Sequence, residues 1–164
     1  MIREHFEILL EELLNKTRDF YGKRLVALAV FGSVGRGCPR PDSDTDILLI
    51  AEDLPSGRLK RMAEFEEGVE KKLAPLLKGL KEAGIDTYLS PVIKTPQEAE
   101  RGSPLFLDMV EDCKILYDRQ GFFKNCLEKL QKRLLELGAQ RIWRGNSWHW
   151  VLKKDWEKGE IFKL

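Results

Sequence analysis

The chain has 164 residues, of which 28 are basic and 27 acidic, so its formal net charge is +1. This length predicts a single domain spanning residues 1–164. The balanced charge argues against a protein that neutralises nucleic-acid phosphates over a broad basic surface, although a local basic patch is compatible with it. Three widely spaced cysteines without a Cys-x-x-Cys pair argue against a zinc knuckle and a disulfide framework.

The N-terminal sequence and the apolar runs predict a cytoplasmic protein with no membrane partner. The first seven residues, Met-Ile-Arg-Glu-His-Phe-Glu, carry acids where a secretory signal would be basic and then apolar. No apolar run approaches the roughly 20 residues that a membrane-spanning helix needs.

The first expected elements are an amphipathic helix over residues 2–20 and a strand over Leu25–Phe31. The helix is predicted by large apolar residues that recur at spacings of three and four, with glutamates between them: Phe6, Leu9, Leu10, Leu13 and Leu14. The strand is a continuous apolar run, which is typical of a strand buried on both faces. Residues 32–43 hold three glycines and two prolines and predict a loop with room for one helical turn.

A second strand is expected over Thr45–Ala51, and a long charged helix follows over about 56–83. Ser56 is a plausible N-cap for this helix, and Pro75 should kink or divide it. Ile85–Ile93 reads as a third strand.

The C-terminal half predicts three helices, one strand and an irregular tail. Thr95-Pro96-Gln97-Glu98 is typical of a capped helix start with proline in the first turn. A short helix is expected over Pro104–Glu111, a strand over Lys114–Tyr117 and a helix over 121–137. The tail, 139–164, holds all four tryptophans and predicts short strands and loops.

These elements predict an α/β (α+β) fold in which helices flank a small mixed β-sheet. We expect a core over about residues 1–94 and a C-terminal extension over about 95–164. The extension can form an acceptor pocket or a dimer surface, so a homo-oligomer is left open.

Two carboxylates mark the start of the second expected strand. Asp44 and Asp46 are two residues apart, so both side chains point to the same face of the sheet. Two neighbouring carboxylates repel each other and raise a pKa unless a cation relieves them. Since Mg²⁺ prefers hard oxygen ligands, the pair suggests a magnesium site.

Upstream of the acids, a glycine-rich turn follows the buried first strand. Glycines such as Gly32 allow backbone N–H groups to approach phosphate oxygens, and a helix that starts there would add its positive end. Ser33 can add a hydroxyl donor, and Arg36 can add a fork of N–H donors. A cation site beside a phosphate-binding loop predicts a site for a nucleoside triphosphate.

The spacing of these residues resembles a known signature. Gly32-Ser33, ten intervening residues and then Asp44-x-Asp46 before apolar residues is similar to the signature of the polymerase-β-like nucleotidyltransferase superfamily. With Arg36-Gly37 and Ser43 before the first acid, the string resembles its small prokaryotic branch, the minimal nucleotidyltransferases (MNT). The expected helix, strand, loop and strand of residues 2–51 agree with that family.

The resemblance implies Mg²⁺-dependent transfer of a nucleoside monophosphate from ATP or another NTP to a hydroxyl of an acceptor. It implies two Mg²⁺ ions held by Asp44, Asp46 and a third acid from a later strand. Asp86, at the head of the third expected strand, is our candidate for that acid. If the Asp86 side chain points away, the site retains two carboxylates only.

The acceptor is open at this point. In the resembled branch, acceptors range from small aminoglycoside-like molecules to protein tyrosines and RNA ends. A related role is that of an antitoxin that modifies a partner protein carrying a HEPN domain. The alternative is a catalytically inactive module that keeps the fold and binds nucleotide or protein without turnover.

Simpler interpretations apply to several of these residues. The glycines can form an ordinary turn, and Arg36 can pair with a nearby acid such as Asp42. The segment Trp143–Trp150 can stack on nucleobases, but tryptophans that close the core or cover a sheet edge are more common. An RNA-binding role for Trp143–Lys154 is disfavoured by the near-neutral charge.

Overall fold

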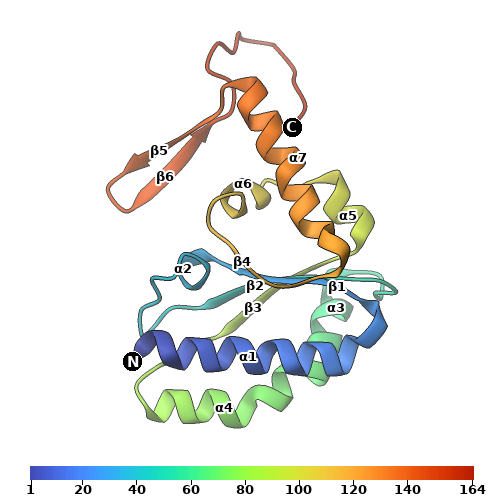
Figure 1. Ribbon diagram of the computed structural model, residues 1–164, viewed down its shortest axis with the longest axis vertical. Helices are drawn as coiled ribbons and strands as arrows, with labels where there is room; N and C mark the ends of the chain where they lie inside the picture. The colour runs from blue at the N-terminus through green and yellow to red at the C-terminus, as the bar shows by residue number, and fades with distance from the viewer.

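A four-stranded mixed sheet forms the centre of the protein, as Figure 1 shows. The computed structural model describes residues 1–164. The strands lie in the order β3-β2-β1-β4, with the bounds β1 Leu25–Phe31, β2 Thr45–Ala51, β3 Leu89–Lys94 and β4 Lys114–Asp118. β1 is antiparallel to β2 and to β4, whereas β2 and β3 are parallel. The predicted small mixed sheet is confirmed, and its fourth strand comes from beyond residue 94, where we expected the core to end.

Helices cover both faces of the sheet. Figure 1 shows α1 and α4 beneath it and α5, α6 and α7 above it. Their bounds, with the helical segments α3 and η2 that precede α4, are α1 Ile2–Tyr21, α3 Arg58–Phe65, η2 Glu66–Glu70, α4 Lys71–Glu82, α5 Pro96–Arg101, α6 Phe106–Met109 and α7 Phe122–Leu137. Short helical turns at Gly22–Arg24, Gly32–Gly35 (α2) and Arg119–Gly121 connect the larger elements. None of the helices combines the length and the apolar character that crossing a membrane requires.

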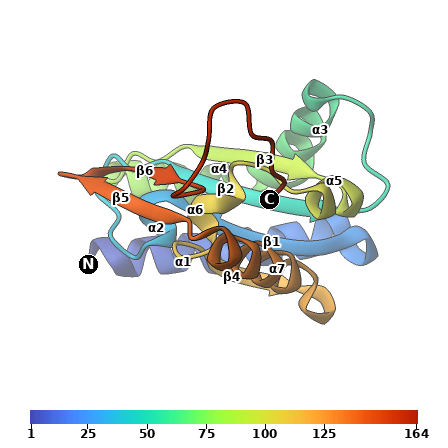
Figure 2. The same cartoon turned by 90° about the horizontal axis from the view of Figure 1, so that it is seen from above.

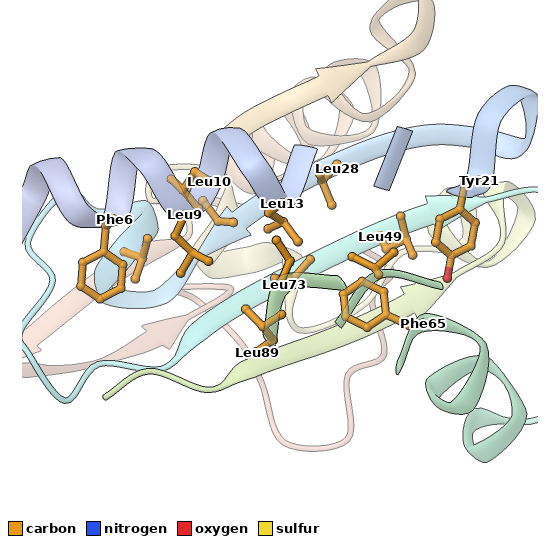
Figure 3. Close-up of a cluster of buried hydrophobic side chains, with 14 of the residues drawn as sticks. Phe6, Leu9, Leu10, Leu13, Tyr21, Leu28, Leu49, Phe65, Leu73 and Leu89 are labelled. Atoms are coloured by element: carbon orange, nitrogen blue, oxygen red, sulfur yellow. The ribbon is translucent and has the colours of Figure 1, made fainter. Parts of the chain in front are cut away.

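The two central strands divide the core into two halves because successive side chains point to opposite faces. Ile47 and Leu49 of β2 belong to the cluster beneath the sheet, which Figure 3 shows packed against α1. Leu48 and Ile50 belong to the cluster above it, together with Phe123 of α7. Both central strands are therefore almost fully buried, as the apolar run of β1 predicted.

The long helix expected over 56–83 exists, but its irregularity lies elsewhere than predicted. Pro75 lies inside α4 without ending it, and the break in regular α-helix is the π-helical turn Glu66–Glu70. Gly68 in that turn lies against the ring of Phe20 from α1, and a side chain there would overlap the ring. The N-cap of α3 is Gly57 rather than Ser56, and no side chain caps the helix.

The third strand is shorter than expected because its first residues bond to the loop before β2. β3 begins at Leu89, whereas the backbone N–H of Asp86 donates to the carbonyl of Pro41 at 2.9 Å. The hydroxyls of Thr87 and Thr45 are buried and hydrogen-bonded at 2.9 Å. This bond attaches the segment before β3 to the start of β2.

The predicted capped helix start at Thr95 is confirmed and serves a second purpose. Thr95 and Glu98 form a reciprocal capping box at the N-terminus of α5. Glu98 also receives two N–H bonds from Arg61 of α3, at 2.8 and 3.0 Å. One glutamate thus begins α5 and links it to α3.

The tryptophan-rich tail forms a two-stranded antiparallel hairpin of β5 (Gln140–Arg144) and β6 (Ser147–Val151). Figure 1 and Figure 2 both show this hairpin extending from the end of α7 toward the side of the molecule where α2 lies. The prediction of short strands and loops in the tail is confirmed.

Two glycine-to-alanine substitutions test the packing of α1 on the η2 turn. We expect Gly68→Ala to lower the free energy of unfolding by about 1–3 kcal/mol, because its methyl group would overlap the Phe20 ring. Gly79→Ala is the matched control, since Gly79 is an exposed residue of α4 with open space around it. This change should raise stability by up to about 1 kcal/mol through helix propensity. Urea unfolding measures both, and a Gly68→Ala variant as stable as the native chain would contradict the packing.

Candidate active site

Two aspartates lie at the start of β2, Asp46 within the strand and Asp44 directly before it. Side chains along a strand alternate, so Asp46 shares with Leu48 and Ile50 the face of the sheet that carries α5, α6 and α7. Thr45, between the two acids, is buried in the opposite direction, where it bonds to Thr87. Asp44 is exposed and Asp46 is half-buried. The strand geometry places Asp46 on this face, whereas a common face for Asp44 stays a prediction.

The glycine turn lies directly beside Asp46. Phe31, the last residue of β1, pairs with Asp46 in the antiparallel ladder, and Gly32 follows it as the first residue of α2. Gly32 has a φ of +63°, and a Cβ at this position would overlap the Asp46 carboxylate. Glycine is therefore required here for its backbone conformation and for the close approach of the acid.

A hydroxyl pair closes the loop between the two strands. The Ser33 hydroxyl donates to the Ser43 hydroxyl at 3.0 Å, and the backbone N–H of Arg40 donates to the same Ser43 oxygen at 2.8 Å. These bonds hold the glycine turn close to the residue that precedes Asp44.

Arg36 extends from the end of the glycine turn with a guanidinium group that forms no hydrogen bond or ion pair with the protein. Asp42, considered above as its partner, pairs instead with Arg40 at 3.6 Å. The Arg36 guanidinium carbon lies 5.0 Å from the ring centroid of Trp148. All five N–H donors of Arg36 are thus available to a ligand.

The electrostatics of the pair favour a bound cation. Burial is the main cause that raises the pKa of Asp46 above its ordinary value, and the negative charge of Asp44 raises it further. The positive charge of Arg36 opposes this shift. Arg36 thus acts on Asp46 electrostatically, but its charge does not cancel the combined effect of burial and Asp44.

Asp86 is not brought to this pair. Its side chain lies 3.6 Å from Lys81 in an exposed ion pair. The residue of β3 opposite Asp46 is Ser90, four positions further along, which corresponds to roughly 13 Å of extended chain. Nowhere does the structure group three histidine, cysteine or acidic side chains that could hold a metal ion together. The position of Asp86 therefore gives no support to its predicted role as third ligand.

Two carboxylates are nevertheless a suitable set for Mg²⁺, which retains several waters and binds through one or two carboxylates together with substrate phosphates. Asp44 and Asp46 would hold the ion. The glycine turn, with Ser33 and Arg36, adjoins Asp46, and its N–H groups can donate hydrogen bonds to phosphate oxygens. The arrangement can orient a cation-bound triphosphate at the start of β2. Three surface hollows, near Arg18, Arg61 and Cys126, are lined by none of these residues.

Sequence reasoning missed the residues that bring the C-terminal hairpin to this face. Asp108 of α6 accepts hydrogen bonds from the indole N–H groups of Trp148 and Trp150, at 2.6 and 3.0 Å. The spacing of two between these tryptophans was the available signal, because it places both indoles on one face of a strand.

Comparison with known proteins agrees with this geometry. The nucleotidyltransferase domain family matches residues 10–117 of the chain. A protein of Methanocaldococcus jannaschii, provisionally named a protein adenylyltransferase, is 33% identical over 125 residues, which cover 75% of this chain and 79% of the relative.

Solved structures with a similar arrangement come from toxin–antitoxin complexes. One, a toxin–antitoxin structure with AMP-PNP, has a TM-score of 0.44 and 20% identity, covering 79% of this chain and 92% of that one. Another, from the complex of a tri-AMPylated HEPN toxin with its MNT antitoxin in Shewanella oneidensis, has a TM-score of 0.40 and 19% identity, covering 80% and 92%.

The contact between Gly32 and Asp46 can be tested with a second glycine of the same turn as control. We expect Gly32→Ala to abolish measurable binding of Mg²⁺–ATP, because the new methyl group would displace the Asp46 carboxylate. Gly37→Ala imposes a similar strain at a φ of +75°, but its nearest neighbour is the flexible end of Arg3 at 3.7 Å. Calorimetric titration should show near-native binding for Gly37→Ala, and equal losses in both variants would refute the role of the contact.

The raised pKa of Asp46 predicts that its charge destabilises the metal-free protein at neutral pH. The folded state holds the Asp46 proton more tightly than the unfolded state, so this group contributes stability that is fully present below the unfolded pKa and is lost as pH rises through the folded pKa. In EDTA at pH 7, Asp46→Asn should therefore raise the melting temperature modestly. The gain should disappear below the ordinary pKa of aspartate, about 3.9. A lower melting temperature for Asp46→Asn at pH 7 would contradict this electrostatic account.

Proposed function

This chain belongs to the nucleotidyltransferase domain family, and on that premise we propose that it transfers AMP from Mg²⁺-bound ATP to a hydroxyl group of a protein. The observation that supports the proposal is the close approach of the Asp46 carboxylate to Gly32, which sets the proposed cation ligand beside the proposed phosphate-binding turn. Adenylate as the transferred group, and protein as the acceptor, are supported by the provisional name of the Methanocaldococcus relative.

In the proposed reaction, the acceptor oxygen forms a bond to the α-phosphorus of ATP while the bond to pyrophosphate breaks, and the hydroxyl proton passes to solvent. Asp44 and Asp46 would hold Mg²⁺, which, when bound, neutralises phosphate charge and lowers the pKa of a coordinated hydroxyl. Gly32 and Ser33 would orient the phosphates through their backbone N–H donors. Arg36 would stabilise the negative charge that accumulates on the phosphate oxygens as pyrophosphate departs. Catalysis by these residues consists of positioning and charge neutralisation.

The resemblance to the minimal nucleotidyltransferases extends the proposal to the partner. We place a HEPN-domain protein first among candidate acceptors, with this chain as the antitoxin that modifies it. A hydroxyl-bearing side chain of that partner would be the site of AMP attachment.

A second candidate function is nucleotide or protein binding without turnover. It is favoured by the position of β3, which sets Ser90 opposite Asp46 and leaves Asp86 paired with Lys81. A site with two carboxylates would still bind a Mg²⁺–triphosphate complex. It would then release no pyrophosphate with any acceptor.

Transfer of label from α-labelled ATP distinguishes these functions. The purified protein is incubated with Mg²⁺, labelled ATP and lysate of the source organism, or a purified HEPN-domain protein where the source encodes one. We expect label on a protein band with the native chain. Asp44→Asn and Asp46→Asn should each reduce the transfer at least about 100-fold, because each removes a charged ligand of the cation. Acid-stable label on RNA, or on small molecules only, would refute the protein acceptor.

Asp86→Asn is the matched control, because it also replaces an aspartate near the strand edge. From its ion pair with Lys81 we expect native transfer rates and native ATP affinity for this variant. A loss of transfer with unchanged ATP binding would instead assign Asp86 to the reaction. ATP binding by the native chain without any label transfer would favour the binding module.

A further inference from the structure

An aromatic side chain of the hairpin of β5 and β6 contacts the arginine at the end of the glycine turn. Trp148 of β6 lies with its ring centroid 5.0 Å from the guanidinium carbon of Arg36. Trp148 is half-buried, whereas Arg36 is exposed and has no other partner in the protein. The only group that holds the Arg36 guanidinium is therefore this indole.

The indole is itself held in place from several sides. The antiparallel register places Arg141, Trp143, Trp148 and Trp150 on one face of the hairpin. The rings of Trp143 and Trp148 are 4.8 Å apart, and the Arg141 guanidinium carbon lies 4.8 and 5.3 Å from them. The indole N–H of Trp148 donates to Asp108 at 2.6 Å. These contacts fix the indole of Trp148 beside the guanidinium of Arg36.

The same face of the hairpin is joined to the segment that supports the glycine turn. Arg141 forms ion pairs with Asp112 and, at 2.7 Å, with Glu111, both in the loop between α6 and β4. The backbone carbonyl of Asp112 lies close to Gly35 of α2, 3.1 Å from where a Cβ would be. The hairpin, the loop before β4 and the glycine turn therefore form one continuous unit.

From this geometry we propose that Trp148 is a positioning residue of the triphosphate site. It holds the guanidinium of Arg36 over the glycine turn, so that the C-terminal hairpin completes a site that β1, α2 and β2 begin. The inference rests on the proposed function, in which Arg36 binds the phosphates.

The chemistry of the two groups suits this division of roles. A tryptophan ring is the best aromatic partner for a cation and attracts the flat face of a guanidinium. The N–H donors of Arg36 lie in the plane of the group, so stacking leaves them free for phosphate oxygens. A long exposed side chain otherwise loses much conformational freedom when it binds a ligand. Contact with Trp148 reduces that loss by restricting Arg36 beforehand.

A matched pair of substitutions tests the ring itself. Trp148→Leu and Trp148→Phe both lose the bond to Asp108 and both keep an apolar side chain, but only phenylalanine keeps an aromatic face. Affinities for Mg²⁺–ATP and for Mg²⁺ with inorganic tripolyphosphate are measured by calorimetry. Trp148→Leu should weaken both about fivefold, a size typical of an exposed cation–π contact. Trp148→Phe should recover most of the loss, and Trp156→Leu, a change at an exposed tryptophan outside the hairpin, should behave as the native chain.

A double-mutant cycle connects the effect to Arg36. Arg36→Ala should weaken both ligands at least as much, and Trp148→Leu should have no further effect in its presence. If the losses of affinity in the two single variants added up in the double variant, the inference would be overturned. It would also be overturned if Trp148→Leu weakened binding of ATP but not of tripolyphosphate, because the indole would then stack on the base. Native affinity in Trp148→Leu with weakened binding in Arg36→Ala would overturn the inference alone. Native affinity in Arg36→Ala would overturn both the inference and the proposed phosphate role of Arg36.

Discussion

The alternation of side chains along β2 is the constraint on which the site depends. Thr45 is buried and bonded to Thr87, and the residues that continue its direction, Ile47 and Leu49, pack beneath the sheet. Asp46 therefore points the other way, and Asp44, directly before the strand, lies close enough to raise the pKa of Asp46. A slip of one residue in this register would turn the Asp46 carboxylate toward α1 and Thr45 toward the opposite face. The apolar core therefore determines which face of the sheet can carry the chemistry.

That face is the one that the second half of the chain covers. α5, α6 and α7 pack on it, so the polar residues between α6 and β4 lie near the glycine turn. The family match ends at residue 117, close to the end of β4, and the hairpin that contacts Arg36 lies entirely beyond it. The part of the chain within the family match holds the two aspartates and the glycine turn, and the segment beyond it supplies Trp148. A nucleotidyltransferase of this kind can vary the surroundings of Arg36 without altering the sheet.

The elements whose signal lies within a few residues could be predicted from the sequence. β1 and β2 begin and end at the predicted residues because continuous apolar runs mark strands buried on both faces. The sequence did not show that α4 continues through Pro75, because this depends on the packing of the helix. It also did not show the position of Asp86, which depends on a hydrogen bond from its backbone N–H to the carbonyl of Pro41. The relation of Trp148 to Arg36 was beyond reach, because cation–π contacts leave no mark in the spacing of either segment.

Arg36 and Trp148 are 112 residues apart in the chain, a separation that governs when the site becomes complete. During synthesis the glycine turn and both aspartates are available early, whereas the indole follows only after α7 has been made. A nascent chain can therefore build its sheet while the arginine is still without its aromatic partner. Closing such a long loop costs entropy, which the pairing of β4 with β1 and the bonds of the hairpin to Asp108 and Asp112 offset. The contact between Arg36 and Trp148 thus requires both the glycine turn and the C-terminal hairpin to be in place.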